Sequence, residues 1–206
     1  MRLSCLQENL SRGLTVVGRA IAARTTLPIT QNVLLQTDDS RLKLAATNLE
    51  IAISTWIGAQ VDTEGSITIP SRLLTEFVNS LPSDRIDIDL SDQPKGISLK
   101  CARFEANING MDAIDFPPIP TVESGVIGKI DSRKLSEAIS HVAFAAATED
   151  SRPVLTGIKV EIEGQKFTFA AADGFRLAVF KGDLLEPVTE SVSFIIPARA
   201  LQEVNR

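Results

Sequence analysis

The sequence holds few of the residues that enzyme and metal sites most often use. Its 206 residues include two cysteines, one histidine, one tryptophan and no tyrosine. Cys5 and Cys101 are too few for a disulfide framework and lack the spacing of metal ligands, which suits a reducing compartment. The single histidine, His141, has no serine or cysteine nucleophile visibly paired with it, and we interpret it as a packing or boundary residue. The sequence therefore predicts no catalytic centre, no metal site and no cofactor.

Long hydrophobic runs and an excess of basic residues are also lacking. No apolar run approaches the ~18–20 residues that cross a bilayer, and no signal-peptide core follows Met1. Asp and Glu outnumber Lys and Arg by 26 to 21, which gives a net charge of −5. We expect a soluble, cytoplasmic protein with no membrane association. Any contact with DNA must come from a local basic surface.

Two short motifs superficially suggest chemistry. Residues 125–129 contain two glycines and a lysine, but they lack the spacing and the following Ser or Thr of a phosphate-binding loop. We interpret them as a strand after a linker. Asp112 and Asp115 could be offered as an acid–base pair, but they lie in a proline-bounded loop without a partner. Solvated turn residues are the interpretation we adopt for them.

An internal repeat is the main feature that the sequence does contain. Pro28 and Pro153 lie 125 residues apart, and the same offset aligns many apolar positions around them. The aligned pairs include Leu10 with Leu135, Leu14 with Ile139, Val33 with Ile158, Leu44 with Phe169 and Ala46 with Ala171. Later the offset becomes 127, where residues 69–72 meet residues 196–199. Apolar positions that hold register over such a span predict two copies of one fold.

Each copy combines amphipathic helices with alternating strands. The apolar helix faces are Leu6, Leu10, Leu14, Val17 and Ile21 in the first copy and Leu135, Ile139, Val142 and Ala146 in the second. Asp131 or Ser132 is placed to cap the second of these helices. A further helix over residues 73–81 follows Pro70. Strands are predicted at residues 42–44, 67–69, 86–90, 97–101, 104–108 and 166–169. The pattern predicts an α+β fold with antiparallel sheets.

A cluster of prolines at residues 117–120 marks the boundary between the copies. We expect a first unit at residues 1–120 and a second at residues 121–206. In the first copy a helix and three strands follow Pro70, whereas the sequence stops soon after Pro197. We therefore expect the second unit to be truncated in its C-terminal part, and the chain to be a fragment of a longer protein.

Arginines recur on the predicted helices. Arg12 and Arg19 lie two turns apart opposite the first apolar face, Arg24 follows that helix, and Arg72 and Arg199 open the next helix of each copy. In the second copy Glu137 and Phe144 stand where the first has Arg12 and Arg19, so the basic face is sparser there. Solvated helix faces are one interpretation. Helices of successive copies laid side by side would instead form a discontinuous cationic surface that contacts phosphates without reading bases.

Four segments resemble, in the same order, the beta subunit of the bacterial replicative DNA polymerase, the sliding-clamp family. They are residues 25–29, 46–50, 151–157 and 171–178, and the resemblance extends from Met1 to Arg206. It implies the DNA clamp fold, in which repeated processivity-clamp units each pack two helices on antiparallel sheets. Family members carry three units per chain, and two chains form a ring-shaped homodimer. This chain would supply the first unit and part of the second, with the third unit absent.

The resemblance also implies a function. The family encircles double-stranded DNA and tethers the replicative polymerase as a non-catalytic processivity factor. The residues implied for DNA contact are Arg24, which matches a DNA-contacting position of the family, with Arg12, Arg19, Arg72 and Arg199. A hydrophobic pocket would receive short linear motifs of the polymerase catalytic subunit, the clamp loader and repair proteins. Its matching residues are Arg152, Leu155, Gly174, Phe175, Arg176 and Leu177. Ala172 and Phe175 replace residues that are often more polar in the family, which predicts a more apolar pocket.

The last strand of the first unit is expected to be a sheet edge at the subunit interface, with Phe104, Ala106 and Ile108 on it. Its partner, the third unit of the other subunit, is absent, so we expect this chain not to form the ring. Two other classes remain open. One is a duplicated protein-interaction module with no role on DNA, and the other is an enzyme whose catalytic residues lie beyond Arg206.

Overall fold

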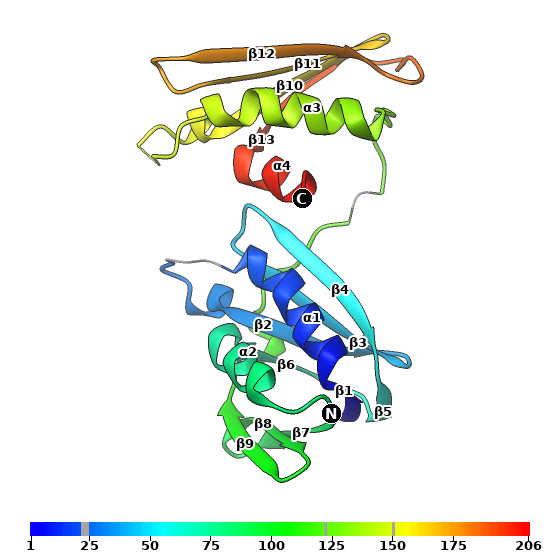
Figure 1. The fold of residues 1–206 in the computed structure, drawn as a ribbon, viewed down its shortest axis with the longest axis vertical. Helices are drawn as coiled ribbons and strands as arrows, with labels where there is room; N and C mark the ends of the chain where they lie inside the picture. The colour runs from blue at the N-terminus through cyan, green and yellow to red at the C-terminus, as the bar shows by residue number, and fades with distance from the viewer. Residues whose placement is uncertain (22–24, 122, 150) are drawn as a thin grey trace. The chain divides into compact units, whose positions relative to one another are not determined.

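The computed structural model describes residues 1–21, 25–121, 123–149 and 151–206. They divide into two units, Met1–Pro120 (unit 1) and Thr121–Arg206 (unit 2), and each unit has its own hydrophobic core. Both units pack helices on antiparallel sheets (Figure 1). The α+β prediction is therefore confirmed.

Unit 1 contains two antiparallel sheets. The first has the strand order β5-β1-β7-β8-β9, with β1 at Arg2–Leu6, β5 at Gln60–Thr63, β7 at Arg85–Asp92, β8 at Lys95–Cys101 and β9 at Phe104–Asn109. The second has the order β4-β3-β2-β6, with β2 at Asn32–Asp38, β3 at Arg41–Thr47, β4 at Ala52–Gly58 and β6 at Ser66–Pro70. The predicted strands of this unit all fall within observed ones.

Two helices of unit 1 lie against each other. They are α1 at Gln7–Val17 and α2 at Ser71–Ser80. The buried side chain of Gln7 donates from Nε2 to the backbone oxygen of Val78 at 2.8 Å, and Ser11 Oγ donates to Asn79 Oδ1 at 2.7 Å. These bonds fix which sides of the two helices meet, and so determine which side chains the pair turns to solvent.

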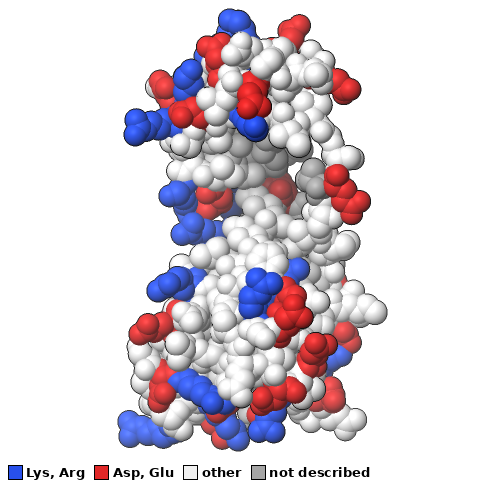
Figure 2. All heavy atoms as spheres, turned by 90° about the vertical axis from the view of Figure 1, so that its right-hand side faces the viewer, with Lys and Arg blue, Asp and Glu red and all other residues white. Residues whose placement is uncertain are grey.

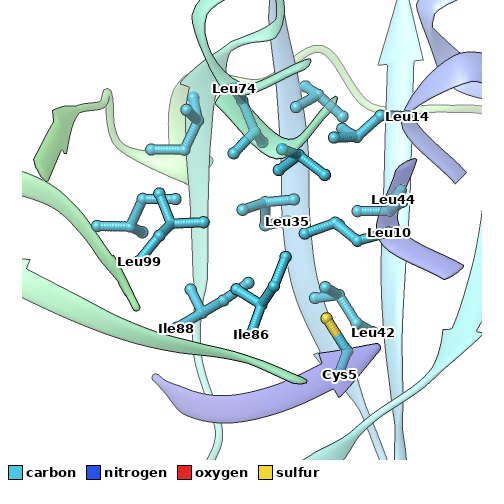
Figure 3. Packing of buried hydrophobic residues seen from close by; sticks show 14 of the residues in the cluster. Cys5, Leu10, Leu14, Leu35, Leu42, Leu44, Leu74, Ile86, Ile88 and Leu99 are labelled. Carbon is cyan, nitrogen blue, oxygen red and sulfur yellow. The ribbon is translucent and has the colours of Figure 1, made fainter. Parts of the chain in front are cut away.

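The core of unit 1 lies between its helices and both sheets (Figure 3). Leu10 and Leu14 of α1 meet Leu35 of the four-stranded sheet, and Ile88 and Leu99 come from the five-stranded sheet. All five side chains are almost fully removed from solvent. At about 1.5–3 kcal/mol for each large apolar side chain, this burial is the main term that holds the helices on the sheets.

A smaller cluster covers the opposite face of the four-stranded sheet. Leu34 and Ala45 alternate along their strands with core residues, so they point to the other side. They are buried against Phe116, which follows the short 3-10 helix η3 at Ala113–Asp115. The end of unit 1 thus lies across its own sheet.

Unit 2 repeats the four-stranded half of this plan. Its sheet has the order β12-β11-β10-β13, with β10 at Gly157–Glu163, β11 at Lys166–Ala172, β12 at Leu177–Asp183 and β13 at Val192–Pro197. The helix α3, at Ser132–Val142, runs along one face of this sheet, and α4 at Ala198–Val204 follows β13 (Figure 1). The starts of β10, β11 and β12 lie 125 residues after those of β2, β3 and β4.

Several details of the sequence prediction are wrong. Ile21 and Ala146 were assigned to helix faces, but each follows the 3-10 turn after its helix and has extended backbone. Leu6 does not lie on the apolar face of the first helix, because it ends strand β1 and its side chain is exposed. Residues 125–129 are not a strand. The backbone N–H of Leu185 donates to the oxygen of Lys129 at 2.8 Å, and a single bond does not make a ladder.

Candidate functional site

The predicted basic residues of unit 1 lie on the outward side of its helices. Arg12 is exposed on α1, and Arg19 is exposed in the 3-10 helix η1 at Gly18–Ala20, just after α1 ends. Arg24 lies outside the described residues. At 3.6 residues per turn, Arg12 points away from Leu10 and Leu14, which are buried in the core.

The second helix of each unit begins with an exposed arginine. Arg72 of α2 forms an ion pair with Glu76, with 2.8 Å between Nε and Oε1. Both side chains are exposed to solvent, which screens the attraction between them, so a phosphate could replace the carboxylate at little cost. Arg199 is exposed in the first turn of α4. Both arginines lie on solvent-facing helix turns.

The outward face of α3 carries one basic residue that the sequence prediction missed. Arg133 is exposed in the first turn and lies four residues before Glu137, hence on the same helix face. Asp131 caps this helix, accepting from the backbone N–H groups of Arg133 and Lys134 at 3.1 and 3.2 Å. The alignment of the two copies hides Arg133, because its counterpart 125 residues earlier is the acidic Glu8.

The surface charges are mixed rather than gathered into one basic field. On the face that Figure 2 shows, Lys and Arg side chains lie among Asp and Glu side chains in each unit. With a net charge of −5, any attraction of such a surface for a polyanion would come from a few local arginines.

A pocket of about 220 Å³ lies on the sheet of unit 2. Its lining is largely apolar and consists of Val154, Leu155, Gly157, Lys159, Ala170, Ala171, Ala172, Leu177 and Ile195. Leu155 comes from the 3-10 helix η5 at Pro153–Thr156, and Leu177 is the first residue of β12. Two of the six predicted pocket residues therefore meet at one concave surface, together with the substituted position Ala172.

The other four predicted residues lie around a turn beside this pocket. Gly174 adopts a φ of +94°, which side-chain-bearing residues rarely adopt, and Phe175 at the turn's tip is 97% exposed. The Asp173 carboxylate accepts from the backbone N–H groups of Phe175 and Arg176 at 2.9 and 3.0 Å. These bonds lower the pKa of the Asp173 carboxyl below its ordinary value. The turn is thus held in an Asx geometry that leads directly into Leu177.

Two arginines lie at this turn. Arg176 pairs with Asp173 at 2.8 Å, and its guanidinium lies over the ring of Phe144, 5.7 Å from the ring centroid. The guanidinium of Arg152 lies close to Gly174. A Cβ atom added to Gly174 would be 3.5 Å from Arg152 Nη1. Both arginines therefore lie beside the apolar pocket, and Arg176 is already held by Asp173.

Several lining residues were missed because they come from different strands. Lys159 is on β10, Ala170 on β11 and Ile195 on β13, and only the sheet register brings them together. One signal was available in the sequence. Alternation along β10 and β11 assigns Lys159 and Ala170 to the face opposite the core residues Val160 and Phe169.

Strand β9, which contains the three predicted interface residues, is an edge of the five-stranded sheet. Phe104 is exposed, with the Arg103 guanidinium 5.4 Å from its ring centroid, and Ala106 is half-buried. Ile108 instead belongs to the core cluster. One side of this edge therefore offers backbone groups and an aromatic side chain to a partner strand.

His141 stacks on Phe180, with 5.9 Å between ring centroids, and remains largely exposed. Within the described ranges, no group of three or more His, Cys, Asp or Glu side chains is arranged to hold a metal ion. No helix among the described residues has the length and apolar character needed to cross a membrane.

Comparison with known proteins gives a consistent result. Residues 1–120 match the family model for the DNA polymerase III beta subunit, N-terminal domain, and residues 129–206 match that for its central domain. The chain is 37% identical over 228 residues to the beta sliding clamp of Synechocystis sp., an alignment that covers 100% of this chain and 57% of that protein. It is 34% identical to the beta sliding clamp of Synechococcus elongatus, covering 100% of this chain and 56% of that one. The crystal structure of the DNA polymerase sliding clamp from Bacillus subtilis superposes with a TM-score of 0.90 at 27% identity, again over 100% of this chain and 56% of that one.

Repeated α+β units of this plan define the class of protein as one with the DNA clamp fold. The chain belongs to the family of the DNA polymerase III beta subunit, whose curated relatives are named beta sliding clamps. It spans about half the length of the curated relatives that it matches.

Proposed function

We propose that this chain forms part of a sliding clamp, a non-catalytic processivity factor that encircles duplex DNA and tethers the replicative polymerase. The observation that carries the proposal is that both units match, in order, domains of the beta-subunit family. Because the matched relatives are nearly twice as long, the ring-shaped homodimer is proposed for a chain of their length. Its work on bacterial DNA would take place in the cytoplasm.

The outward faces of α1 and α2 are proposed to face the DNA. Arg12 and Arg19, with Arg72 nearby on α2 and Arg199 in unit 2, would contact phosphates without reading bases. Arg24 is proposed for the same role. A few weak contacts in an acidic protein suit a ring that slides, because tight phosphate binding would slow its movement and make retention depend on salt.

The test uses a chain extended to the length of its relatives and loaded by a clamp loader onto nicked circular DNA. Retention is compared before and after the circle is linearised. A sliding ring should stay on the circle and be lost only on linearisation, because it is held by topology. Equal retention on both forms would overturn the ring mechanism in favour of direct binding. No retention on either, with an active loader, would favour an interaction module without a DNA role.

The arginine assignment has a charge-matched control. Arg12→Gln with Arg19→Gln should lower the amount of clamp loaded several-fold, because each lost phosphate contact weakens the encounter with DNA. The control is Arg41→Gln with Lys43→Gln, which removes the same charge from β3. Arg41 and Lys43 alternate with the core residues Leu42 and Leu44, so they lie on the sheet face turned away from the helices. Equal loss in both double variants would refute a specific role for the helix face.

The pocket of unit 2 is proposed to bind short linear motifs of the polymerase catalytic subunit, the clamp loader and repair proteins. The apolar surface of Leu155 and Leu177 suits a leucine or aromatic anchor, and Arg152 and Arg176 beside it suit carboxylates. Ala172 and Phe175 add no hydrogen-bonding side chain, so an apolar motif is preferred.

A matched pair of variants tests this pocket. Leu177→Ala should weaken binding of a peptide from the polymerase catalytic subunit by about tenfold, because it removes an anchor surface from the pocket. Val179→Ala truncates another exposed apolar residue two positions along the same strand, outside the pocket lining, and should change affinity little. Fluorescence anisotropy of the labelled peptide measures both. An unchanged affinity for Leu177→Ala would remove this site from the proposal.

The β9 edge is proposed as the subunit contact of the longer ring. The 206-residue stretch by itself is proposed to stay out of a closed ring. Native mass spectrometry compares this stretch with the longer chain, and a stable closed dimer of the 206-residue stretch would contradict the proposal.

A further inference from the structure

The first long helix of each unit carries an acidic and a basic residue four positions apart, and the two units carry them in opposite order. In α1 Glu8 precedes Arg12, whereas in α3 Arg133 precedes Glu137. At the repeat offset of 125 residues, Glu8 aligns with Arg133 and Arg12 with Glu137. All four side chains are exposed. The two charges are therefore exchanged position by position between the units.

The charged pair of α3 lies on the side of the helix away from the core of unit 2. The buried residues of this helix are Ala138, Ile139 and Val142. At 3.6 residues per turn, the positions of Arg133 and Glu137 fall on the opposite side of the helix from these three. Both charges are therefore presented to whatever lies against the outward face of α3.

The order of charges in α3 is unfavourable for the helix itself. An anion in the first turn interacts favourably with the positive end of the helix dipole, and a cation there does not. A carboxylate four residues before a cation also stabilises a helix more than the reverse order does. Glu8 and Arg12 meet both conditions in α1, and Arg133 and Glu137 meet neither in α3. Helix stability therefore does not account for the position of Arg133.

The turn that carries Arg133 has a defined conformation. Asp131 accepts from the backbone N–H groups of Arg133 and Lys134 at 3.1 and 3.2 Å and so fixes the first turn of α3. Glu137 lies 4.0 Å from His141 Nδ1. Among the residues that the structure describes, Arg133 forms no ion pair. Its guanidinium can therefore bind an external anion without first losing an internal partner.

The exchange moves the cation along the helix face and keeps it on that face. Four residues correspond to a displacement of about 6 Å along the helix axis. Duplex DNA presents one negative charge for about every 1.7 Å of its own axis, so a cation displaced by this amount still meets a phosphate. A cation at Arg133 therefore suits the same polyanion as a cation at Arg12.

We propose that Arg133 is the phosphate contact of α3, one helix turn before the position that Arg12 has on α1, and that Glu137 weakens DNA binding at that position. This inference rests on the proposed function, because it adds a contact to the surface proposed to face the DNA. An attractive and a repulsive charge one turn apart hold DNA weakly, which suits a ring that moves along it.

A photo-crosslink tests the position of Arg133. Benzoylphenylalanine is introduced in place of Arg133, Arg12 or Lys181 in the chain extended to the length of its relatives. Each protein is loaded onto nicked circular DNA and irradiated. Lys181 is the control, because it alternates on β12 with Phe180, which packs against the core of unit 2, and so faces away from α3. We expect crosslinks to DNA from positions 12 and 133, and several-fold fewer from position 181.

The outcomes separate this inference from the proposed function. Crosslinks from position 12 without crosslinks from position 133 would overturn the assignment of Arg133 and leave the clamp proposal intact. If the protein is retained on the circle and neither position crosslinks, the helix faces do not meet DNA and the assignment of Arg133 is also wrong. Failure of the unmodified protein to be retained on the circle would contradict the proposed function itself.

Two substitutions of opposite sign test the charges. Arg133→Gln should lower the amount of clamp loaded by about twofold or more, and Glu137→Gln should raise it by a similar factor, because each changes the attraction to phosphates. Lys181→Gln and Glu163→Gln remove the same charges from the other side of the sheet, where Glu163 alternates with the core-facing Ile162. Both controls should load like the wild type. Changes as large in the controls as in α3 would refute a local contact.

Thermal unfolding excludes a purely structural role for Arg133. Because a cation in the first turn opposes the helix dipole, Arg133→Gln should unfold at the wild-type temperature or slightly above it. Arg133→Lys keeps the positive charge and should load like the wild type. A lower unfolding temperature for Arg133→Gln, or loading by Arg133→Lys as poor as by Arg133→Gln, would overturn the phosphate contact.

Discussion

The thiol of Cys5 ties the stability of unit 1 to pH. Burial, with a smaller contribution from Asp87, raises the pKa of the Cys5 thiol from 9.0 to about 12. The unfolded thiol therefore loses its proton first as pH rises above 9, and stability that is fully present below pH 9 is lost progressively up to about pH 12. From pH 8 to pH 10 the wild-type chain should lose about 1 kcal/mol more unfolding free energy than Cys5→Ala. Urea unfolding at both pH values measures this difference, and equal losses would show that the thiol is not the cause.

Single residues of the site were predictable to different degrees. Leu155 and Leu177 were identified as pocket residues from the resemblance, and the structure places both in the pocket lining. Gly174 and Phe175 lie at the turn beside the pocket lining and not in it. The left-handed φ of Gly174 directs the Phe175 side chain into solvent. Lys159 was not predicted, since a lone lysine on an alternating strand is typical of any solvated sheet face.

The turn before β12 is an element whose conformation depends on one carboxylate. Asp173 accepts two backbone N–H groups, from Phe175 and Arg176, so Asp173→Ala leaves both donors without this acceptor. Hydrogen exchange at these two amides should accelerate by about fivefold or more. Asp183→Ala at the far end of the same strand is the control and should leave them unchanged. Unchanged exchange in Asp173→Ala would mean that the turn is held by the sheet alone.

Element boundaries were less predictable than element types. The first helix begins at Gln7 without a side-chain cap, because the backbone N–H of Gln7 donates to the oxygen of Asp84 at 2.9 Å. That partner is distant in sequence, so no local signal marks the start. Strand β1 was missed because it is short. Leu3 and Cys5 belong to the core and alternate with Arg2 and Ser4, but Leu6 breaks this alternation and was assigned to the apolar face of the helix.

At the scale of the whole molecule, the repeat was the most informative sequence signal. Apolar positions at a constant offset predicted two copies of one fold, and β10, β11 and β12 start at that offset from β2, β3 and β4. The packing of residues 113–119 on the sheet of unit 1 could not be predicted in this way. Phe116 lies in a proline-rich stretch whose composition is typical of a linker. Only the structure shows that the Phe116 ring is buried against Leu34 and Ala45. The repeat thus predicts the common scaffold, and the burial of Phe116 had to be observed.

Because the two units have separate cores, a core substitution in one unit should leave the stability of the other unit unchanged. Leu35 is buried in the core of unit 1 and Phe167 in that of unit 2, and none of the residues that the structure describes belongs to both core clusters. Leu35→Ala should destabilise unit 1 by about 3 kcal/mol, because it removes buried methyl groups and leaves a cavity. Amide exchange should then accelerate across unit 1 while unit 2 keeps its protection. Phe167→Ala should give the reverse pattern with a similar magnitude. Hydrogen-exchange mass spectrometry follows both units in one experiment. Equal loss of protection in both units from either variant would mean that the chain unfolds as one cooperative body, and the description of two independently packed repeats would fail.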